Sequence, residues 1–294
     1  MKNIIQYVGL VILILFSFFY TEKTVSTIKK QDPLMIQIEE SKEEYSVSAI
    51  DAVVSDISII PGMKGCEVDV EKSYYNIKRL GEFNSNLLEY KTSEPKVKLE
   101  DNYDKYITSG NKIKNTVSLI FKVKKNTNID NIIKTLNEKN IKATFFMDGR
   151  YIENNISKVE SLIKEGHEVL NYGYDNMYDK DLIIWNNNLL ERINYNNPKF
   201  CYLEKEDINT LNLCANNKMK TVMPNLIIDK SPLLEVKTNI EKGSLIAFNV
   251  SDIVEQELNL VINYIIQKGY NIDILSKHLE ESTLSTCKKC KTCD

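Results

Sequence analysis

Residues 116–176 constrain the fold more than any other part of the chain, because their hydrophobic pattern switches repeatedly between two periods. Apolar residues occupy every second position from 117 to 123, the pattern of a strand with one buried face. They recur at helical spacing over 129–136, and residues 141–147 are β-branched and aromatic, as in a buried strand. A second helical stripe covers 156–163. Strands alternating with helices in this way predict a parallel sheet with crossover helices, an α/β fold.

The same rhythm continues to the C-terminal region of the chain. Helical stripes cover residues 208–214 and 254–265, and residues 244–250 have the composition of a strand. Trp185 is the only tryptophan, and within this pattern it is expected in the core rather than on a sugar-binding surface.

Two short runs in this region match the motifs of a known family. Residues 142–146 read K-A-T-F-F, residues 165–168 read E-G-H-E, and Asn171 follows at the matching position. The chain therefore resembles the polysaccharide deacetylase family, the NodB homology domain, over approximately residues 115–280. The resemblance implies a distorted, incomplete (β/α) barrel, whose functional residues lie at the C-terminal ends of the strands.

The positions that carry the chemistry of that family hold other residues here. The resemblance implies a general base at position 122, metal ligands at 123, 172 and 176, and a general acid at 249. The residues present are Lys122, Val123, Tyr172, Asn176 and Asn249. Lysine and valine do not bind a divalent cation, and tyrosine and asparagine are poor zinc ligands. The family's metal is therefore predicted to be lost, and no catalytic residue is predicted.

The number of histidines supports this prediction independently of any alignment. The family's site uses three histidines, whereas this chain has two, His167 and His278. His167 directly follows a predicted helix end and is expected to be structural. His278 lies in a C-terminal helical run and is expected at the surface.

The altered positions allow more than one function. The degenerate pocket is expected to comprise Lys122, Val123, Tyr172, Tyr174, Asn176 and Asn249. Such polar and aromatic groups can bind sugar hydroxyls, but the pocket can equally be blocked. We predict an inactive deacetylase-like protein that binds glycan or serves in assembly at the cell envelope. The alternative is an active carbohydrate N-deacetylase or hydrolase with a rebuilt site that uses Lys122, Asp148 or Asp175.

The N-terminal segment predicts attachment to a membrane. Residues 4–20 are apolar and uncharged, a length at the short end for a membrane span. A cleaved signal peptide is the competing interpretation, but no small-x-small site follows. We predict a single-pass signal-anchor, with most of the chain outside the cytoplasm because the resembled family acts on envelope sugars. The net charge of −3 gives no indication of a nucleic-acid partner.

These features predict five consecutive parts. They are a signal-anchor at 1–21, a linker at 22–43, a small α+β accessory domain at 44–110, a barrel at 111–281 and a cysteine-rich tail at 282–294.

The tail contains Cys287, Cys290 and Cys293 at C-x2-C-x2-C spacing. Three thiolates can bind a soft metal, but structural zinc usually takes four ligands, and cysteines outside the cytoplasm tend to oxidise. Disulfide or intermolecular pairing is therefore the first interpretation and metal binding the second. Cys66, Cys201 and Cys214 bring the total to six, whose pairing the sequence leaves open.

Overall fold

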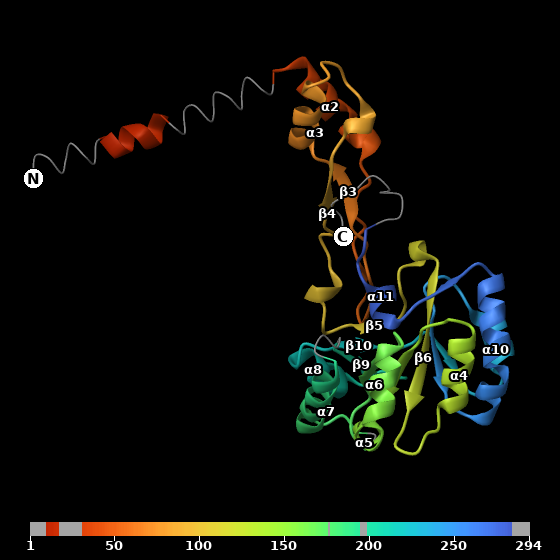
Figure 1. The fold of residues 1–294 in the computed structure, drawn as a ribbon. Helices are drawn as coiled ribbons and strands as arrows, with labels where there is room; N and C mark the ends of the chain where they lie inside the picture. The colour runs from red at the N-terminus through yellow and green to blue at the C-terminus, as the bar shows by residue number, and fades with distance from the viewer. Residues whose placement is uncertain (1–9, 18–30, 176, 195–198, 284–294) are drawn as a thin grey trace, which may run out of the picture. The chain divides into compact units, whose positions relative to one another are not determined.

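The computed structural model describes residues 10–17, 31–175, 177–194 and 199–283 (Figure 1). The chain divides into two compact units. The first contains Met1–Ala49, Lys64–Glu94 and Thr283–Asp294, and the second contains Ile50–Met63 and Pro95–Ser282. The segment 44–110, predicted as one accessory domain, is thus shared between the two units.

Between residues 31 and 94, the described part of the first unit contains two helices and a hairpin. Its elements are α2 (Pro33–Tyr45), β3 (Gly65–Val68), α3 (Val70–Lys78), a 3-10 turn (Ser85–Leu87) and β4 (Tyr90–Ser93). The Asp32 carboxylate caps α2 by accepting the Leu34 N–H and also accepts the Tyr74 hydroxyl at 2.7 Å. Because Tyr74 belongs to α3, this one side chain both starts α2 and joins it to its neighbour.

The second unit is built around a parallel six-stranded sheet. Its order is β11-β12-β6-β7-β8, and β13 also pairs with β6. The strands are β6 (Thr116–Val123), β7 (Thr144–Met147), β8 (Glu168–Asn171), β11 (Leu226–Ile228), β12 (Leu245–Asn249) and β13 (Asn271–Ile272). All their pairings are parallel, so the predicted α/β fold is confirmed.

The helices of the second unit lie between its strands or follow the last of them. They are α4 (Asp130–Glu138), α5 (Gly149–Asn154), α6 (Ile156–Lys164), α7 (Lys180–Ile193), α8 (Ile208–Asn216), α9 (Pro232–Asn239), α10 (Asp252–Gln267) and α11 (Leu275–Leu279). Figure 1 shows α4 and α10 beside β6. Their apolar stripes and the odd-numbered side chains of β6 form one core, in which Phe121 stacks between Phe145 and Phe248.

A second sheet covers the other face of β6. It has the order β1-β2-β5-β10-β9, with β1 (Val53–Val54), β2 (Ser58–Ile60), β5 (Tyr106–Ile107), β9 (Phe200–Tyr202) and β10 (Lys220–Val222). Two 3-10 turns, Leu99–Asp101 and Lys112–Lys114, flank β5. Side chains of the two sheets meet in a second core that contains Ile120, Phe146 and Val222. The strand predicted with one buried face is therefore buried on both faces.

The described strands of this unit form two sheets rather than one hydrogen-bonded barrel. The edge strands β8 and β9 are connected by Tyr178 instead of by backbone pairing. Its hydroxyl donates to the Asn171 carbonyl at 3.2 Å and accepts the Tyr202 N–H at 3.0 Å. The opening between the sheets is thus bridged by a side chain.

Positive φ angles favour glycine at two turns of the second unit. Gly166 follows the end of α6 with a φ of +90°. Gly243 has a φ of +85°, and a Cβ there would lie 2.4 Å from the Gly110 carbonyl oxygen. Any larger residue at position 243 would combine a strained backbone with a steric clash.

The N-terminal prediction falls largely outside the described residues. Residues 10–17 are helical, and the remainder of 4–20 is not described. None of the described helices has both the length and the apolar character to cross a membrane. The cysteines of the tail also lie outside the described residues.

His278 is buried, and its predicted surface position was wrong. Its exposure is 1%, and its Nδ1 lies 2.9 Å from the Ser118 hydroxyl. Its Nε2 has no hydrogen-bond partner in the described part of the chain. Gly110 makes room for the ring, because a Cβ there would lie 2.1 Å from Nε2. Burial, with nearby Lys114, lowers the pKa of His278 from 6.5 to about 3.

This pKa predicts a loss of stability in mild acid. The unfolded chain binds a proton at His278 below pH 6.5 and the folded chain does not, so this stabilisation is complete above pH 6.5 and falls as the pH falls towards about 3. Between pH 6.5 and 5 the loss is about 2 kcal/mol at ~1.36 kcal/mol per pKa unit. Urea unfolding at both pH values, followed by Trp185 fluorescence, measures it.

The matched variant is His278→Asn. The free energy of unfolding of the wild-type chain relative to this variant should fall by that amount between the two pH values. His167, whose buried ring has a pKa lowered to about 4, and Glu168, whose pKa burial raises with the opposite effect, are present in both proteins and cancel. A difference that does not change with pH would contradict the assignment.

Candidate functional site

Lys122 is the central charge at the C-terminal end of the six-stranded sheet. It lies in register with Asn249 of β12 on one side and Phe146 of β7 on the other. The side chain is only 6% exposed and faces the core between the two sheets. Its Nζ forms an ion pair with Glu204, which lies in the loop after β9.

This ammonium group lies beside a cluster of aromatic rings. The Lys122 Nζ lies 5.8 Å from the centroid of the Tyr202 ring. That ring contacts Phe146 at 5.2 Å and Tyr172 at 5.7 Å between centroids, and Tyr172 also meets Tyr178 edge-on at 6.4 Å. Burial raises the pKa of all three tyrosines, so their phenols remain neutral at physiological pH.

Burial also acts on Lys122 itself. Loss of solvation, with a smaller effect of Lys124, lowers the pKa of Lys122 from 10.5 to about 8, and Asp229 opposes this shift. The paired carboxylate of Glu204 acts in the same direction as Asp229, because an adjacent negative charge favours the ammonium form. The Tyr202 hydroxyl donates to Glu204 Oε1 at 3.3 Å and helps to hold the carboxylate there.

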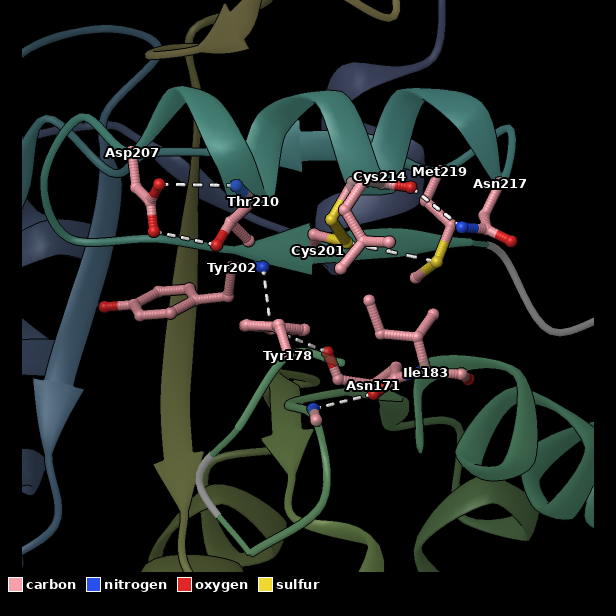
Figure 2. The surroundings of a disulfide bond; sticks show 12 residues. Asn171, Tyr178, Ile183, Cys201, Tyr202, Asp207, Thr210, Cys214, Asn217 and Met219 are labelled. Carbon is pink, nitrogen blue, oxygen red and sulfur yellow. Dashed lines mark hydrogen bonds between the residues drawn. A yellow bond between two sulfur atoms is a disulfide. The ribbon is translucent and has the colours of Figure 1, made fainter. Parts of the chain in front are cut away.

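A disulfide fixes β9, the strand that ends at Tyr202 and leads to Glu204 (Figure 2). Cys201 of β9 is bonded to Cys214 of α8, and both are fully buried next to Met219. Asp207 begins α8 by accepting the N–H of Thr210 and its hydroxyl at 3.3 and 2.8 Å. Cys66 is disulfide-bonded as well.

Asn171, part of the family motif, organises the end of β8. Its Oδ1 accepts the Gly173 N–H at 2.7 Å and the Asn186 amide at 2.9 Å, and its Nδ2 donates to the Ile183 carbonyl at 3.1 Å. His167, the other polar motif residue, accepts the Ala143 N–H at 3.2 Å and packs edge-on against Phe145. Its expected structural role is confirmed.

The structure brings together some of the predicted pocket residues and separates others. Lys122, Tyr172 and Asn249 lie at the same end of the sheet and on the face towards the second sheet. Val123 is fully buried in the opposite core, among the residues packed against the helices. Asn176 lies outside the described residues.

Tyr174 belongs to a separate surface cluster. Its hydroxyl donates to Glu153 at 2.8 Å, and its ring meets Trp185 edge-on at 5.1 Å. The guanidinium of Arg150 lies 5.5 Å from the same ring. Trp185 is 41% exposed, so its expected position in the core was wrong. The helical stripe of α7 buries Ile183 and Leu190, and Trp185 lies beside it.

The two aspartates considered for a rebuilt active site have structural contacts. Asp148 is fully buried and caps α5 by accepting the Arg150 N–H at 2.8 Å. Asp175 has a φ of +55° and forms a 3.1 Å ion pair with Arg150. Neither contact joins these carboxylates to Lys122.

The side chains at this end of the sheet do not fit the divalent metal that the family implies. The ammonium group of Lys122 occupies the position of the family's base, and the side chain of Val123 points into the other core. Tyr172, at a ligand position, is a phenol whose pKa burial raises. A second cation near Lys122 would be repelled. Across the described residues, no group of three His, Cys, Asp or Glu side chains is arranged to hold a metal.

Three residues of this site were missed by sequence reasoning. Tyr178 bridges the ends of β8 and β9, Tyr202 is the last residue of β9, and Glu204 follows it in the next loop. None of them stands at a position for which the resemblance implied a catalytic role. Their positions at or after the ends of strands could have identified them, because the C-terminal ends of neighbouring parallel strands lie at one edge of the sheet. Glu204 stands two residues after the end of β9.

Comparison with known proteins agrees with this architecture. Residues 109–199 match the family model of polysaccharide deacetylase. The uncharacterized protein YlxY of Bacillus subtilis (strain 168) is 26% identical over 280 residues, which cover 89% of this chain and 88% of that protein. Wild-type BA3943 of Bacillus anthracis, described as a CE4 family pseudoenzyme, is 25% identical with a TM-score of 0.64, covering 85% of this chain and 96% of that chain.

A protein described as a deacetylase shares the fold with a lower TM-score. The structure of the Bc1960 peptidoglycan N-acetylglucosamine deacetylase is 23% identical with a TM-score of 0.54 and covers 60% of this chain and 94% of that chain. The fold and the site are therefore similar to those of the polysaccharide deacetylases. The predicted resemblance to the polysaccharide deacetylase family is confirmed, and the similar structures include a pseudoenzyme.

Proposed function

We propose that this protein is an inactive, polysaccharide deacetylase-like protein of the cell envelope that binds glycan. The observation that carries the proposal is the Lys122–Glu204 ion pair, which lies where the family places its catalytic base. A deacetylase needs a nucleophilic water, which a bound metal generates by lowering the pKa of that water. A buried ammonium group paired with a carboxylate provides no equivalent.

Glycan binding is supported by the side chains around this ion pair. The partly exposed ring of Tyr172 offers an apolar face for a sugar ring, and the partly exposed Asn249 amide beside Lys122 offers a donor and an acceptor for hydroxyls. Membrane attachment through residues 4–20, an extracytoplasmic location and a cell-wall glycan or envelope protein as partner complete the proposal. They rest on the sequence pattern and the family resemblance.

Sedimentation with insoluble peptidoglycan tests binding. For the full chain in detergent, Tyr172→Ala and Asn249→Ala should each weaken binding by about tenfold or more, as loss of a central contact does in protein interfaces. Tyr75→Ala, which removes a 52% exposed ring from the first unit, is the matched control and should bind as wild type. Retained binding by both site variants would reject the site.

Acetate release from N-acetylated peptidoglycan and chitin oligomers is measured on the same wild-type samples. The expected result is no release, either with added zinc or cobalt or with a chelator. Metal-dependent release would contradict the proposed inactivity and favour the rebuilt active site.

A further inference from the structure

The two residues of the Lys122–Glu204 ion pair differ in burial and in the kind of element that carries them. The lysine side chain is 6% exposed and the glutamate side chain 40% exposed. Lys122 belongs to the central strand β6, held by β12 on one side and β7 on the other. Glu204 stands in the loop between β9 and α8. The ammonium is therefore fixed in place, whereas the carboxylate is carried by a half-exposed loop residue.

A buried ammonium group next to aromatic rings requires a negative partner. Removing a charge from water is costly unless an opposite charge compensates it, and burial accordingly lowers the pKa of Lys122. Glu204 is the carboxylate that pairs with it in the described structure. Departure of Glu204 alone would leave the ammonium uncompensated, but replacement by another carboxylate would preserve the ion pair.

From this asymmetry we propose that Glu204 occupies the position of a ligand carboxylate and that the site binds a carboxylate-bearing saccharide. This proposal rests on the glycan-binding function proposed above and adds the ligand's chemical class. The incoming carboxylate takes the place of Glu204 on Lys122, and Glu204 turns into the solvent that it already partly contacts. The Tyr202 hydroxyl, now a donor to Glu204, then donates to the ligand.

Exchange of one carboxylate for another makes the site selective against neutral sugars. A neutral sugar offers no charge to Lys122, so it has to bind beside the intact ion pair or leave the lysine unpaired. An acidic sugar keeps the number of ion pairs constant and adds contacts between its ring and the partly exposed Tyr172. Glu204 therefore competes with the ligand, and its removal should strengthen binding.

The test compares two sugars that differ in one acidic substituent. N-acetylmuramic acid carries a lactyl ether with a carboxylate that N-acetylglucosamine lacks, and the methyl ester of N-acetylmuramic acid keeps the shape without the charge. Calorimetric titration of the full chain in detergent should give an affinity for the acid at least about tenfold above that for either neutral sugar. Glu204→Gln should raise the affinity for the acid by about threefold to tenfold.

Two further variants isolate the cause. Glu206→Gln makes the same charge change at an exposed residue of the same loop and should leave the affinity unchanged. Lys122→Met should remove the preference for the acid. If that variant does not fold, the Glu204→Gln and methyl-ester measurements still test whether the site binds a carboxylate.

The possible outcomes separate the two proposals. Equal affinities for the acid and its ester, or unchanged or weaker binding of the acid by Glu204→Gln, would overturn the carboxylate site. Peptidoglycan binding sensitive to Tyr172→Ala would then leave the glycan-binding function intact. Absence of binding to both sugars and to peptidoglycan would overturn both proposals.

Discussion

Replacing Phe121 by alanine is expected to lower the free energy of unfolding by about 3–5 kcal/mol, the usual cost of truncating a buried aromatic residue. Phe121 is fully buried on the central strand, with ring centroids 5.3 Å from Phe145 and 5.2 Å from Phe248. Its removal leaves a cavity between three adjacent strands that cannot collapse without distorting the sheet. Urea unfolding followed by fluorescence of Trp185, the only tryptophan, reports on this unit.

Ile266→Ala is the control for this measurement. Ile266 lies on α10 in the same unit but is 48% exposed, so its truncation should change the free energy of unfolding by less than about 0.5 kcal/mol. Similar effects of both substitutions would mean that the aromatic stack is not central to the stability of this unit.

The Phe121 side of the fold was predictable from the sequence because the pattern that forms it is local. Alternation over 117–123 places Phe121 on a buried face, and the stripe of α4 supplies the side chains that cover it. Both signals lie within about 25 residues of each other, so neither requires knowledge of the rest of the chain.

The other face of the same strand was not predictable in this way. Ser118 and Lys122 have the residue types of a solvent-facing row, yet both are buried. They are covered by a second sheet whose strands lie as far away in sequence as residues 53–54 and 220–222. Local periodicity carries no information about such a cover. The burial of His278 against Ser118, across 160 residues, went unrecognised for the same reason.

The candidate site likewise contains residues that the sequence identified and residues that it did not. The resemblance located Lys122, Tyr172 and Asn249, because each occupies a known position in the family. It did not locate Glu204, which lies 82 residues from its partner. The resemblance also assigned Val123 to the site. In the structure β6 continues to Val123, so the side chain of Val123 points into the opposite core.

Removal of the Cys201–Cys214 disulfide is expected to lower the free energy of unfolding by about 3 kcal/mol, the amount for a closed loop of this approximate length. The two cysteines are 13 residues apart, and their bond connects β9 to α8. Since Tyr202 follows Cys201 directly, the same change should weaken peptidoglycan binding through looser placement of Tyr202 and Glu204. The double variant Cys201→Ala/Cys214→Ala, compared with wild type in urea, measures the effect on stability.

Reducing agent provides the control and separates this disulfide from that of Cys66. Both proteins lose the Cys66 bond in reductant, but only the wild-type chain also loses Cys201–Cys214. The difference of about 3 kcal/mol seen under oxidising conditions should therefore shrink to the small effect of the alanine substitutions themselves. If the difference persisted in reductant, the loss would come from packing around Met219 and Ile183, and the cross-link would not be what holds β9 in place. If it disappears together with the binding defect, the disulfide positions the strand end that carries the counter-ion of Lys122.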